Sequence, residues 1–484
     1  MIVLLIFAVL CVWGIYSNIK EEKRASVHPV PPLALKSSRR LGLEAVIRKI
    51  AGNDVSEEKM DALCLDAPHV LVTARAGTGK TKTIALKVAL AIHEGIRPEN
   101  TLSLCFNRSI AIELGKRIAK FGVQAPTATF HGLAYSIVQP RYGSLLCGEE
   151  QRAIMRGLLS RQTEKRERGA GNEIGELVDD MLTFVSSAKH KGLSVDDIRV
   201  RCVNAGELAL QAASVYAAYE QYLKCHNLID FDDLLRSATD KLNALERLPV
   251  VRINGQTCDL NNLRLLAVDE AQDLSRSFYG IIQVLTEKSP SLQVYAVGDD
   301  FQAVNSFAGS DLDFFRKFET YFHDARRTQL RTNYRSGSVI VEHANNHMRG
   351  LGEGGVAIRK GGSVEHARIS KYEPVHEVVK RLVVGERGRS VLVLARRNVC
   401  FGMELETLQK DLSCFHSNVR VSTIHKAKGG EADVVFFLKE PATKSHLSCL
   451  NVVLGVTDAE MQAEERRIEY VAKTRPREKL VVIE

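Results

Sequence analysis

The chain has 484 residues, of which 45% are hydrophobic and 26% charged, and its formal net charge is +8. This length favours two to four domains, and the composition is that of a globular protein with buried cores. The excess of positive charge suits a polyanionic partner without proving one. No two of the ten cysteines are spaced as CxxC, which argues against a zinc or iron–sulfur motif and indicates free thiols in a reducing compartment.

The N-terminus is much more apolar than the rest of the chain. Residues 2–19 carry no charge and are numerous enough to span a bilayer, whereas Lys20, Lys23 and Arg24 follow directly. The positive-inside rule then predicts a single-pass anchor over residues 1–19, with the remainder on the cytoplasmic face of the membrane. The alternatives are a mis-assigned start or a buried helix, either of which leaves a soluble cytoplasmic protein. Residues 20–50, with three prolines among them, are predicted to be a linker.

Val70–Ile84 has the pattern of a strand, a glycine loop and a helix, which is the context of a phosphate-binding loop. Glycines let backbone N–H groups surround phosphate oxygens, and the start of the helix favours the same anion. Lys80 suits the β- and γ-phosphates of a nucleoside triphosphate, and the Thr81 hydroxyl suits Mg²⁺. A chance glycine turn is the alternative. The predicted ATP-binding residues of the loop are Ala74, Arg75, Ala76, Gly77, Thr78, Gly79, Lys80 and Thr81.

Further strands and helices alternate after this loop, which predicts a parallel α/β sheet. Two short strands end in polar and aromatic residues at Phe106–Asn107 and at Thr129–His131. Ligands of such sheets bind at the carboxyl ends of the strands, so these side chains are candidates for a binding surface. The strand pattern stops from about residue 136 to 227, where we expect an inserted helical subdomain.

Another buried strand, Leu263–Val268, ends in two carboxylates. Asp269 is a candidate ligand of Mg²⁺, and Glu270 is placed to orient or deprotonate an attacking water. An exposed acidic turn is the alternative. Gln302 follows the next strand and is a candidate to contact a γ-phosphate.

A second α/β pattern begins near residue 336, with predicted strands at Ser390–Arg397, Val434–Leu438 and Lys479–Ile483. We therefore predict a first α/β domain over residues 51–335, containing the helical insertion, and a second over 336–484. Tyr334, at the junction, is suited to stacking on a base, and Arg335 to contacting a phosphate.

The chain carries a distinctive series of motifs: ARAGTGKT, LCFNRSIA, TFHGLA, DFDDLL, VDEAQDLS, VGDDFQAVNSFAG, NYRS, STIHKAKGGEADVVF and EERRIEYVAKTR. In this order they closely resemble the UvrD/Rep-type superfamily 1 DNA helicases, and the helicase IV branch most. The resemblance implies two RecA-like domains with ATP and Mg²⁺ between them and single-stranded DNA across their tops. It also implies movement from 3′ to 5′ and strand separation in DNA repair, replication or recombination.

The resemblance assigns roles to individual residues. Lys80, Glu270, Gln302, Arg335 and Arg475 match catalytic positions, and the two arginines match those on the γ-phosphate. Tyr334 matches the residue that stacks on adenine, and Glu431 the acidic residue near the ribose and phosphates. The positions that match the DNA path are Phe106, Asn107, Thr129, His131, Phe307 and His425.

Some residues depart from the family pattern. Lys59 aligns with a glutamine that reads adenine, and lysine only donates hydrogen bonds. Asn305 and Ala308 replace an aromatic and a basic residue, Gly430 replaces a leucine, and the family's large second insertion is missing. A rival interpretation is therefore a DNA-stimulated ATPase or DNA-binding module that does not unwind and is tethered at the membrane. A degenerate, inactive copy is a third.

Overall fold

The computed structural model describes residues 38–52, 55–141, 143–163, 171–203, 205–369, 373–440 and 446–484. The predicted membrane anchor, residues 1–19, lies outside these ranges. Among the described residues, none of the helices combines the length and the apolar character needed to cross a membrane. Helix α2 (Ser38–Ala51) occupies the last part of the predicted linker. The apolar residues from Leu41 to Ile50 recur at helical spacing, which accounts for this helix.

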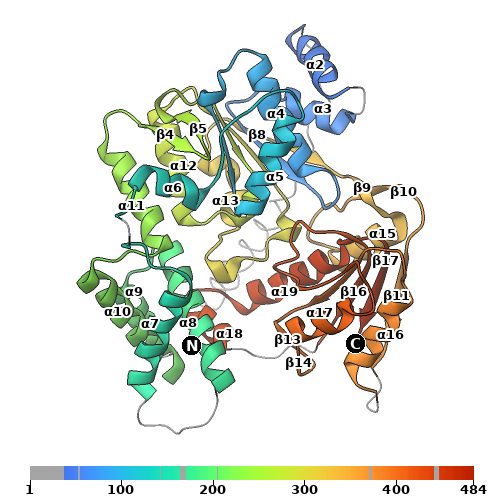
Figure 1. Ribbon diagram of the computed structural model, residues 1–484. Coiled ribbons are helices and arrows are strands. Elements are labelled where there is room, and N and C mark those ends of the chain that lie inside the picture. Colours follow the sequence, from blue (N-terminus) through green and yellow to red (C-terminus); the bar gives the residue numbers. More distant parts are fainter. Residues whose placement is uncertain are drawn as a thin grey trace, which may run out of the picture. The chain divides into compact units, whose positions relative to one another are not determined.

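The first sheet has six parallel strands in the order β3-β2-β6-β7-β1-β8. This arrangement confirms the predicted α/β class (Figure 1). Because all strands run the same way, their carboxyl ends share one edge of the sheet. The strands are β1 (His69–Ala74), β2 (Thr101–Cys105), β3 (Thr127–Thr129), β6 (Leu265–Val268), β7 (Gln293–Gly298) and β8 (Ala325–Leu330).

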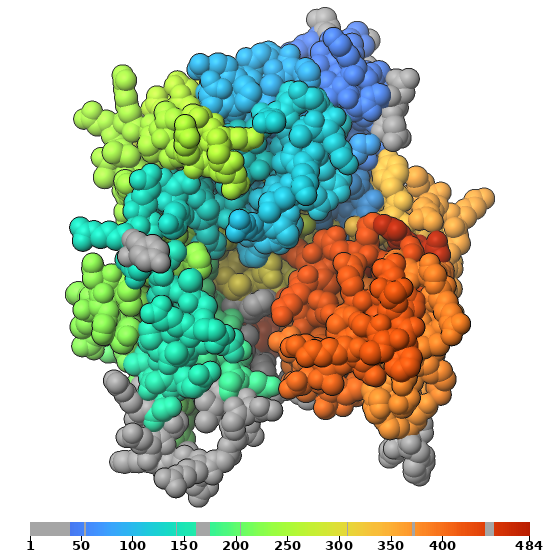
Figure 2. Space-filling model, in the orientation of Figure 1, coloured from blue at the N-terminus to red at the C-terminus, as the bar shows by residue number. Residues whose placement is uncertain are grey.

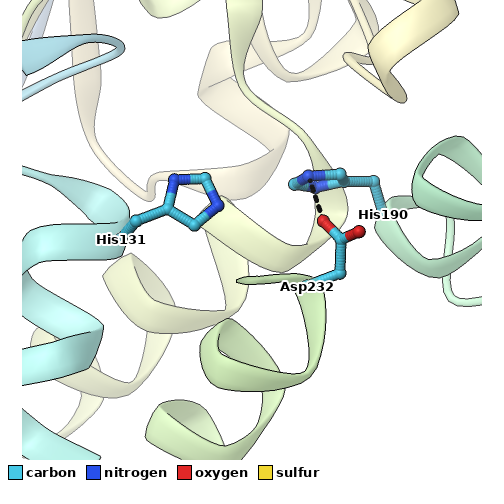
Figure 3. Close-up of side chains that lie close together, drawn as sticks. All are labelled: His131, His190 and Asp232. Carbon is cyan, nitrogen blue, oxygen red and sulfur yellow. Dashed lines mark ion pairs between the residues drawn. The ribbon is translucent and has the colours of Figure 1, made fainter. Parts of the chain in front are cut away.

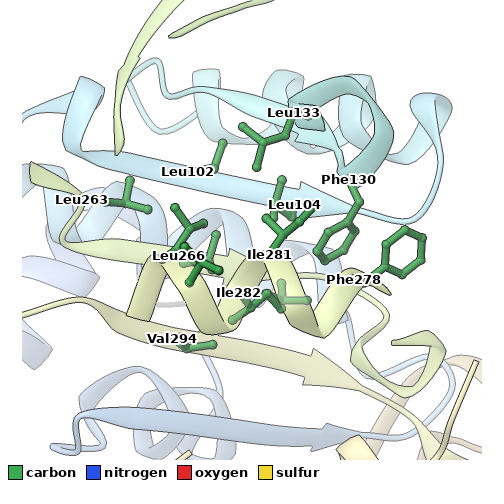
Figure 4. Packing of buried hydrophobic residues seen from close by; sticks show 14 of the residues in the cluster. Leu102, Leu104, Phe130, Leu133, Leu263, Leu266, Phe278, Ile281, Ile282 and Val294 are labelled. Atoms are coloured by element: carbon green, nitrogen blue, oxygen red, sulfur yellow. The ribbon is translucent and has the colours of Figure 1, made fainter. Parts of the chain in front are cut away.

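Helices cover both faces of this sheet, as the uninterrupted apolar runs of its central strands require. Val70 and Val72 of β1 share a buried cluster with α4 (Lys80–His93) and α5 (Arg108–Ala119). Leu71 belongs to the cluster of the opposite face, because successive strand residues point to opposite sides. There the sheet packs against α6 (Phe130–Val138), α11 (Phe231–Ala244) and α12 (Arg276–Lys288), and Figure 4 shows Ile281 and Ile282 of α12 against Leu266 and Val294.

Four helices between β3 and β6 form a separate hydrophobic cluster, in the region where a helical insertion was predicted. They are α7 (Gly148–Thr163), α8 (Gly171–His190), α9 (Val195–Cys202) and α10 (Glu207–His226). A fifth helix, α18 (His446–Val453), comes from the C-terminal part of the chain and packs into the same cluster with Leu450 and Val453. The sequence did not predict this contact.

The second sheet has five parallel strands in the order β11-β17-β16-β12-β15. The part of the chain that contains this sheet and its helices is coloured orange to red in Figure 2. Helix α19 (Asp458–Lys473) packs on one face, and α16 (Val375–Val384) and α17 (Leu405–Ser413) pack on the other. The strands are β11 (Ser363–Ala367), β12 (Val391–Ala395), β15 (Val419–Thr423), β16 (Ala432–Leu438) and β17 (Pro476–Ile483).

Short elements complete the described chain. Strand β9 (Thr332–Gly337) pairs in parallel with β10 (Val356–Arg359), and α15 (Ser338–His347) lies between them in the chain. Further short elements are α3 (Glu57–Cys64), α13 (Asp313–Arg316), α14 (Phe318–Tyr321), and the two-stranded pairs β4 (Val250–Ile253) with β5 (Gln256–Asp259) and β13 (Val399–Cys400) with β14 (Met403–Glu404), besides five 3₁₀ turns.

Candidate functional site

The glycine loop joins the carboxyl end of β1 to the start of α4, as its sequence predicts. Gly77 and Gly79 have φ angles of +75° and +87°, which side chains disfavour. A Cβ on Gly77 would also lie 2.6 Å from Oδ1 of Asn333, so a larger residue would displace the Asn333 side chain from the loop. Lys80 begins α4, and the free N–H groups of its first turn create a favourable place for an anion.

The loop is held in place by β9, from far along the chain. Asn333 donates from Nδ2 to the carbonyl of Ala76 at 2.8 Å, and the backbone N–H of Tyr334 donates to the carbonyl of Gly77 at 2.9 Å. Glu58 of α3 accepts from the N–H groups of Arg331 and Thr332, both at 3.0 Å. These bonds fix Tyr334 beside the loop.

The Arg75 side chain binds other residues of the protein and does not point to the phosphate site. It donates to Asp299 at 2.8 Å, to Asp300 at 2.5 Å and to the carbonyl of Glu353 at 2.7 Å, and its guanidinium lies 3.6 Å above the ring of Phe301. The predicted contact of Arg75 with phosphate is therefore restricted to its backbone.

The two carboxylates after β6 lie opposite the loop. Lys80 Nζ is 3.8 Å from Oε2 of Glu270, and Glu270 has a strained φ of +52°. Burial and the neighbouring Glu270 raise the pKa of Asp269 to about 7. Against the effect of its own burial, Lys80 and Lys428 lower the pKa of Glu270. Among the described residues, Oδ2 of Asp269 is buried without a hydrogen-bond partner, so a divalent cation would satisfy both its lone pairs and its charge.

Two glutamines, both bonded to Asp299, lie between Glu270 and Arg475 in a series of hydrogen bonds. Gln272, in the 3₁₀ turn η3 (Ala271–Asp273), donates to Oε2 of Glu270 at 2.5 Å and accepts from the N–H of Asp299 at 2.9 Å. Gln302, in η4 (Asp300–Gln302), donates to Asp299 at 2.6 Å. The amide oxygen of Gln302 accepts from Arg475 at 2.8 Å. This bond joins the end of α19 to the edge of the first sheet.

Both predicted arginines lie at this junction. Arg475 is 1% exposed, and burial together with the charge of Arg335 lowers its pKa to about 9. Arg335 donates to Oε2 of Glu431 at 2.6 Å and to the carbonyl of Thr474 at 3.2 Å. Although burial opposes it, hydrogen bonds from Arg477 and Arg335 lower the pKa of Glu431. A polyanion here would relieve the cost of holding two guanidinium groups close together.

The residues predicted along a DNA path make different kinds of contact within the protein: two cap helices, one packs on an aromatic ring and one bonds a backbone carbonyl. Asn107 caps α5 by accepting from Ile110 N–H at 2.9 Å, and Thr129 caps α6 by accepting from Gly132 N–H at 2.9 Å. Phe106 packs edge-on against Phe278, with ring centroids 5.9 Å apart. His425 has a hydrogen bond of 3.2 Å to the carbonyl of Val304. Phe307 lies in η5 (Ser306–Ala308), and its side chain is outside the described part.

His131 lies near His190 and Asp232, and their donor atoms are within 4.8 Å of one another (Figure 3). His190 already has partners on both nitrogens, Ser275 Oγ at 2.8 Å and Asp232 Oδ1 at 2.9 Å, so hydrogen bonds account for this arrangement without a metal ion. Burial and His190 lower the pKa of His131 to about 4. His131 is therefore neutral at pH 7 and offers a ring or a neutral hydrogen bond rather than a charge.

Several contacts at the site were not predicted. Lys59 Nζ lies 4.3 Å above the ring centroid of Tyr334. Lys428, from the loop after β15, pairs with Asp273. Glu464 of α19 accepts from both the N–H and the hydroxyl of Ser306, the former at 3.0 Å. Each contact joins residues more than 150 positions apart. A single sequence does not show which of such distant residues come together.

Comparison with known proteins gives two matches to protein families. The UvrD/REP helicase N-terminal domain matches residues 55–323, and the UvrD-like helicase C-terminal domain matches residues 393–484.

Similar curated proteins include "ATP-dependent DNA helicase PcrA" of Staphylococcus aureus, 25% identical over 74% of this chain and 50% of that protein. A "Probable DNA helicase" of Mycoplasma pneumoniae is 24% identical over 89% of this chain and 83% of that protein. The chain thus spans about half the length of the PcrA relatives.

Proposed function

Since this chain belongs to the UvrD/REP helicase family, we propose that it is an ATP-driven motor that moves 3′ to 5′ on single-stranded DNA and separates strands. The observation that carries the proposal is the 2.8 Å bond from Arg475 to Gln302. It brings an arginine of the C-terminal part to the edge of the sheet that holds Lys80 and Glu270. A nucleotide bound between Arg475 and this edge of the sheet would contact the C-terminal part and the first sheet at once. Its hydrolysis would therefore change the contacts of both parts.

In this proposal the two sheets with their helices are RecA-like domains, and the triphosphate lies on the glycine loop. Mg²⁺ fits Asp269, whose Oδ2 has no hydrogen-bond partner within the described ranges, together with the Thr81 hydroxyl. When bound, the ion would neutralise phosphate charge. Lys80 binds the phosphates, Glu270 holds the water for attack, and Arg335 and Arg475 stabilise charge on the departing phosphoryl group.

The DNA path is proposed over the carboxyl edges of the sheets. Phe106, Asn107, Thr129 and His131 lie at the ends of β2 and β3, and Phe307 and His425 belong to η5 and the loop after β15. Because His131 is neutral, it would contribute to DNA binding at the edge of the first sheet by stacking and hydrogen bonding rather than by charge. Placement in the helicase IV branch remains a prediction.

A second candidate is a DNA-stimulated ATPase that does not unwind. The observation in its favour is Asn305, which replaces an aromatic residue of the family pattern and is buried, with 9% of its surface exposed. Its amide thus faces the protein interior, which removes one stacking contact with a base.

The test is ATP hydrolysis by the full chain with and without single-stranded DNA. We expect strong stimulation by DNA and its loss in Lys80→Ala, because the variant lacks the cation at the phosphates. Lys410→Ala changes an exposed lysine of α17 and should behave as the wild type. No hydrolysis by the wild type would refute the proposal.

Unwinding of a forked duplex then separates the two candidates. Product from a fork with a 3′ tail supports the helicase. Hydrolysis without product supports the ATPase that does not unwind.

A further inference from the structure

The last residue of α19 is a buried lysine. Lys473 is 7% exposed, and its Nζ donates at 3.0 Å to Nδ1 of His347, the last residue of α15, and at 3.0 Å to Oε2 of Glu469. Burial lowers the pKa of Lys473, although the Glu469 carboxylate opposes this change. Desolvation of a buried ammonium group offsets much of the energy that its bonds provide, so the placement of α19 explains the contact better than stability does.

His347 is bonded to α19 through both of its ring nitrogens. Its Nε2 lies 3.0 Å from the backbone carbonyl of Arg466, and because a carbonyl only accepts, this nitrogen carries the proton. Nδ1 is then free to accept from the Lys473 ammonium group. Arg466 in turn donates from Nη2 to the carbonyl of His347 at 2.7 Å. Three hydrogen bonds therefore join the end of α15 to the last two turns of α19.

The charges around this pair keep the imidazole neutral. Burial and the Lys473 ammonium group lower the pKa of His347 to about 4. The Glu469 carboxylate, with Oε2 3.7 Å from Nε2 of His347, acts in the opposite direction. Without the ammonium group, Glu469 would therefore favour a protonated imidazole. Other titratable groups near the pair are His343 of α15, His366 of β11, Lys439 after β16 and Glu484 at the end of the chain.

The two helices lead directly to the two arginines of the proposed site. Arg335 belongs to β9, which α15 follows, and Arg475 comes just after the end of α19. The last turn of α19 also holds both side chains, because Arg335 donates to the carbonyl of Thr474 at 3.2 Å and Nε of Arg475 donates to the carbonyl of Val471 at 2.9 Å. The orientation of this turn therefore affects the direction of both guanidinium groups.

We propose that Lys473 and His347 are positioning residues, which hold the last turn of α19 against α15 and thereby fix Arg475 relative to Arg335. This inference rests on the proposed function, since it concerns the arginines of the same site. The pair acts only through these arginines, which stabilise charge that develops in the transition state. Its loss should therefore lower kcat more than it changes KM.

The experiment measures single-turnover ATP hydrolysis and ATP affinity of the full chain, with Mg²⁺ and single-stranded DNA present. Lys473→Met keeps the length of the side chain without its charge, and should slow hydrolysis about tenfold while the affinity changes less than about twofold. His347→Leu should have the same effect, whereas His347→Gln, which retains an acceptor and a donor, should hydrolyse ATP at nearly the wild-type rate. Lys473→Met combined with His347→Leu should be no slower than Lys473→Met alone, because the bond between them is already lost. Lys410→Met, at an exposed lysine of α17, is the matched control.

The pKa of His347, followed by NMR, is a readout that does not depend on hydrolysis. It should rise in Lys473→Met, because the neighbouring cation is removed and Glu469 remains. An unchanged pKa would show that the pair does not form and would overturn the inference. So would hydrolysis by Lys473→Met at the rate of an active wild type, which would leave the proposed motor intact. A wild type that hydrolyses no ATP would refute the motor and this inference together.

Discussion

At the scale of single residues, Arg475 connects the two halves of the site. Its guanidinium is buried, bonded to Gln302, and close enough to Arg335 for that charge to lower its pKa. Such a group stabilises charge on a phosphoryl group in transfer more than it stabilises the bound nucleotide.

Arg475→Ala should therefore leave ATP binding nearly intact and lower the rate of hydrolysis by about 10³-fold. Single-turnover hydrolysis together with nucleotide affinity measures both quantities. Arg381→Ala, which changes an exposed arginine of α16 that pairs with Glu373, is the control. Equal rates for the two variants would remove Arg475 from the catalytic set.

The sequence predicted the strands and helices around the proposed site residues better than the contacts of those residues with distant segments. The glycine loop and the carboxylates after β6 were found because each follows an apolar strand directly, a local pattern. The capping roles of Asn107 and Thr129 were missed although a signal was available, since both stand just before a helical pattern at a preferred N-cap position. The pairing of Arg75 with Asp299 had no such signal, because it depends on the order of the strands.

At the scale of elements, α19 is attached at two points to the segment after β7. Arg475, just beyond its C-terminus, bonds Gln302, and Glu464, in its first half, accepts twice from Ser306 of η5. One helix thus holds both the proposed γ-phosphate contact and the proposed DNA-contacting turn, and a shift of α19 would move both.

Glu464→Gln should weaken this attachment, because an amide replaces one of the two acceptor oxygens with a donor. We expect about tenfold weaker DNA affinity and a smaller stimulation of hydrolysis by DNA, with little change in hydrolysis without DNA. Glu465→Gln is the matched control, since Glu465 pairs with Arg396 on the exposed side of the helix. If both variants bind DNA equally well, Glu464 does not position η5.

At the scale of the whole molecule, the sequence predicted two α/β parts and a helical region, but not how the chain connects them. The eight apolar-rich residues of α18 lie in the sequence between two motifs of the C-terminal part, so the sequence alone suggests that α18 packs within that part. In the structure, α18 instead completes the hydrophobic cluster of α7–α10, where Leu450, Val453 and Leu454 are buried. The helical region and the second sheet are therefore linked by packing as well as by the backbone.

This link predicts that a change in the C-terminal part destabilises the helical region. Leu450 is 0% exposed in the shared cluster, so Leu450→Ala should lower the free energy of unfolding by about 2–5 kcal/mol. Hydrogen exchange should show the loss of protection in α8 and α10, which contact α18, and retained protection in β1, β6 and β7 of the first sheet. Val452→Ala removes a 58% exposed side chain from the same helix and should change neither quantity. Exchange that rises equally in all these elements would mean that α18 stabilises the molecule as a whole rather than the helical region.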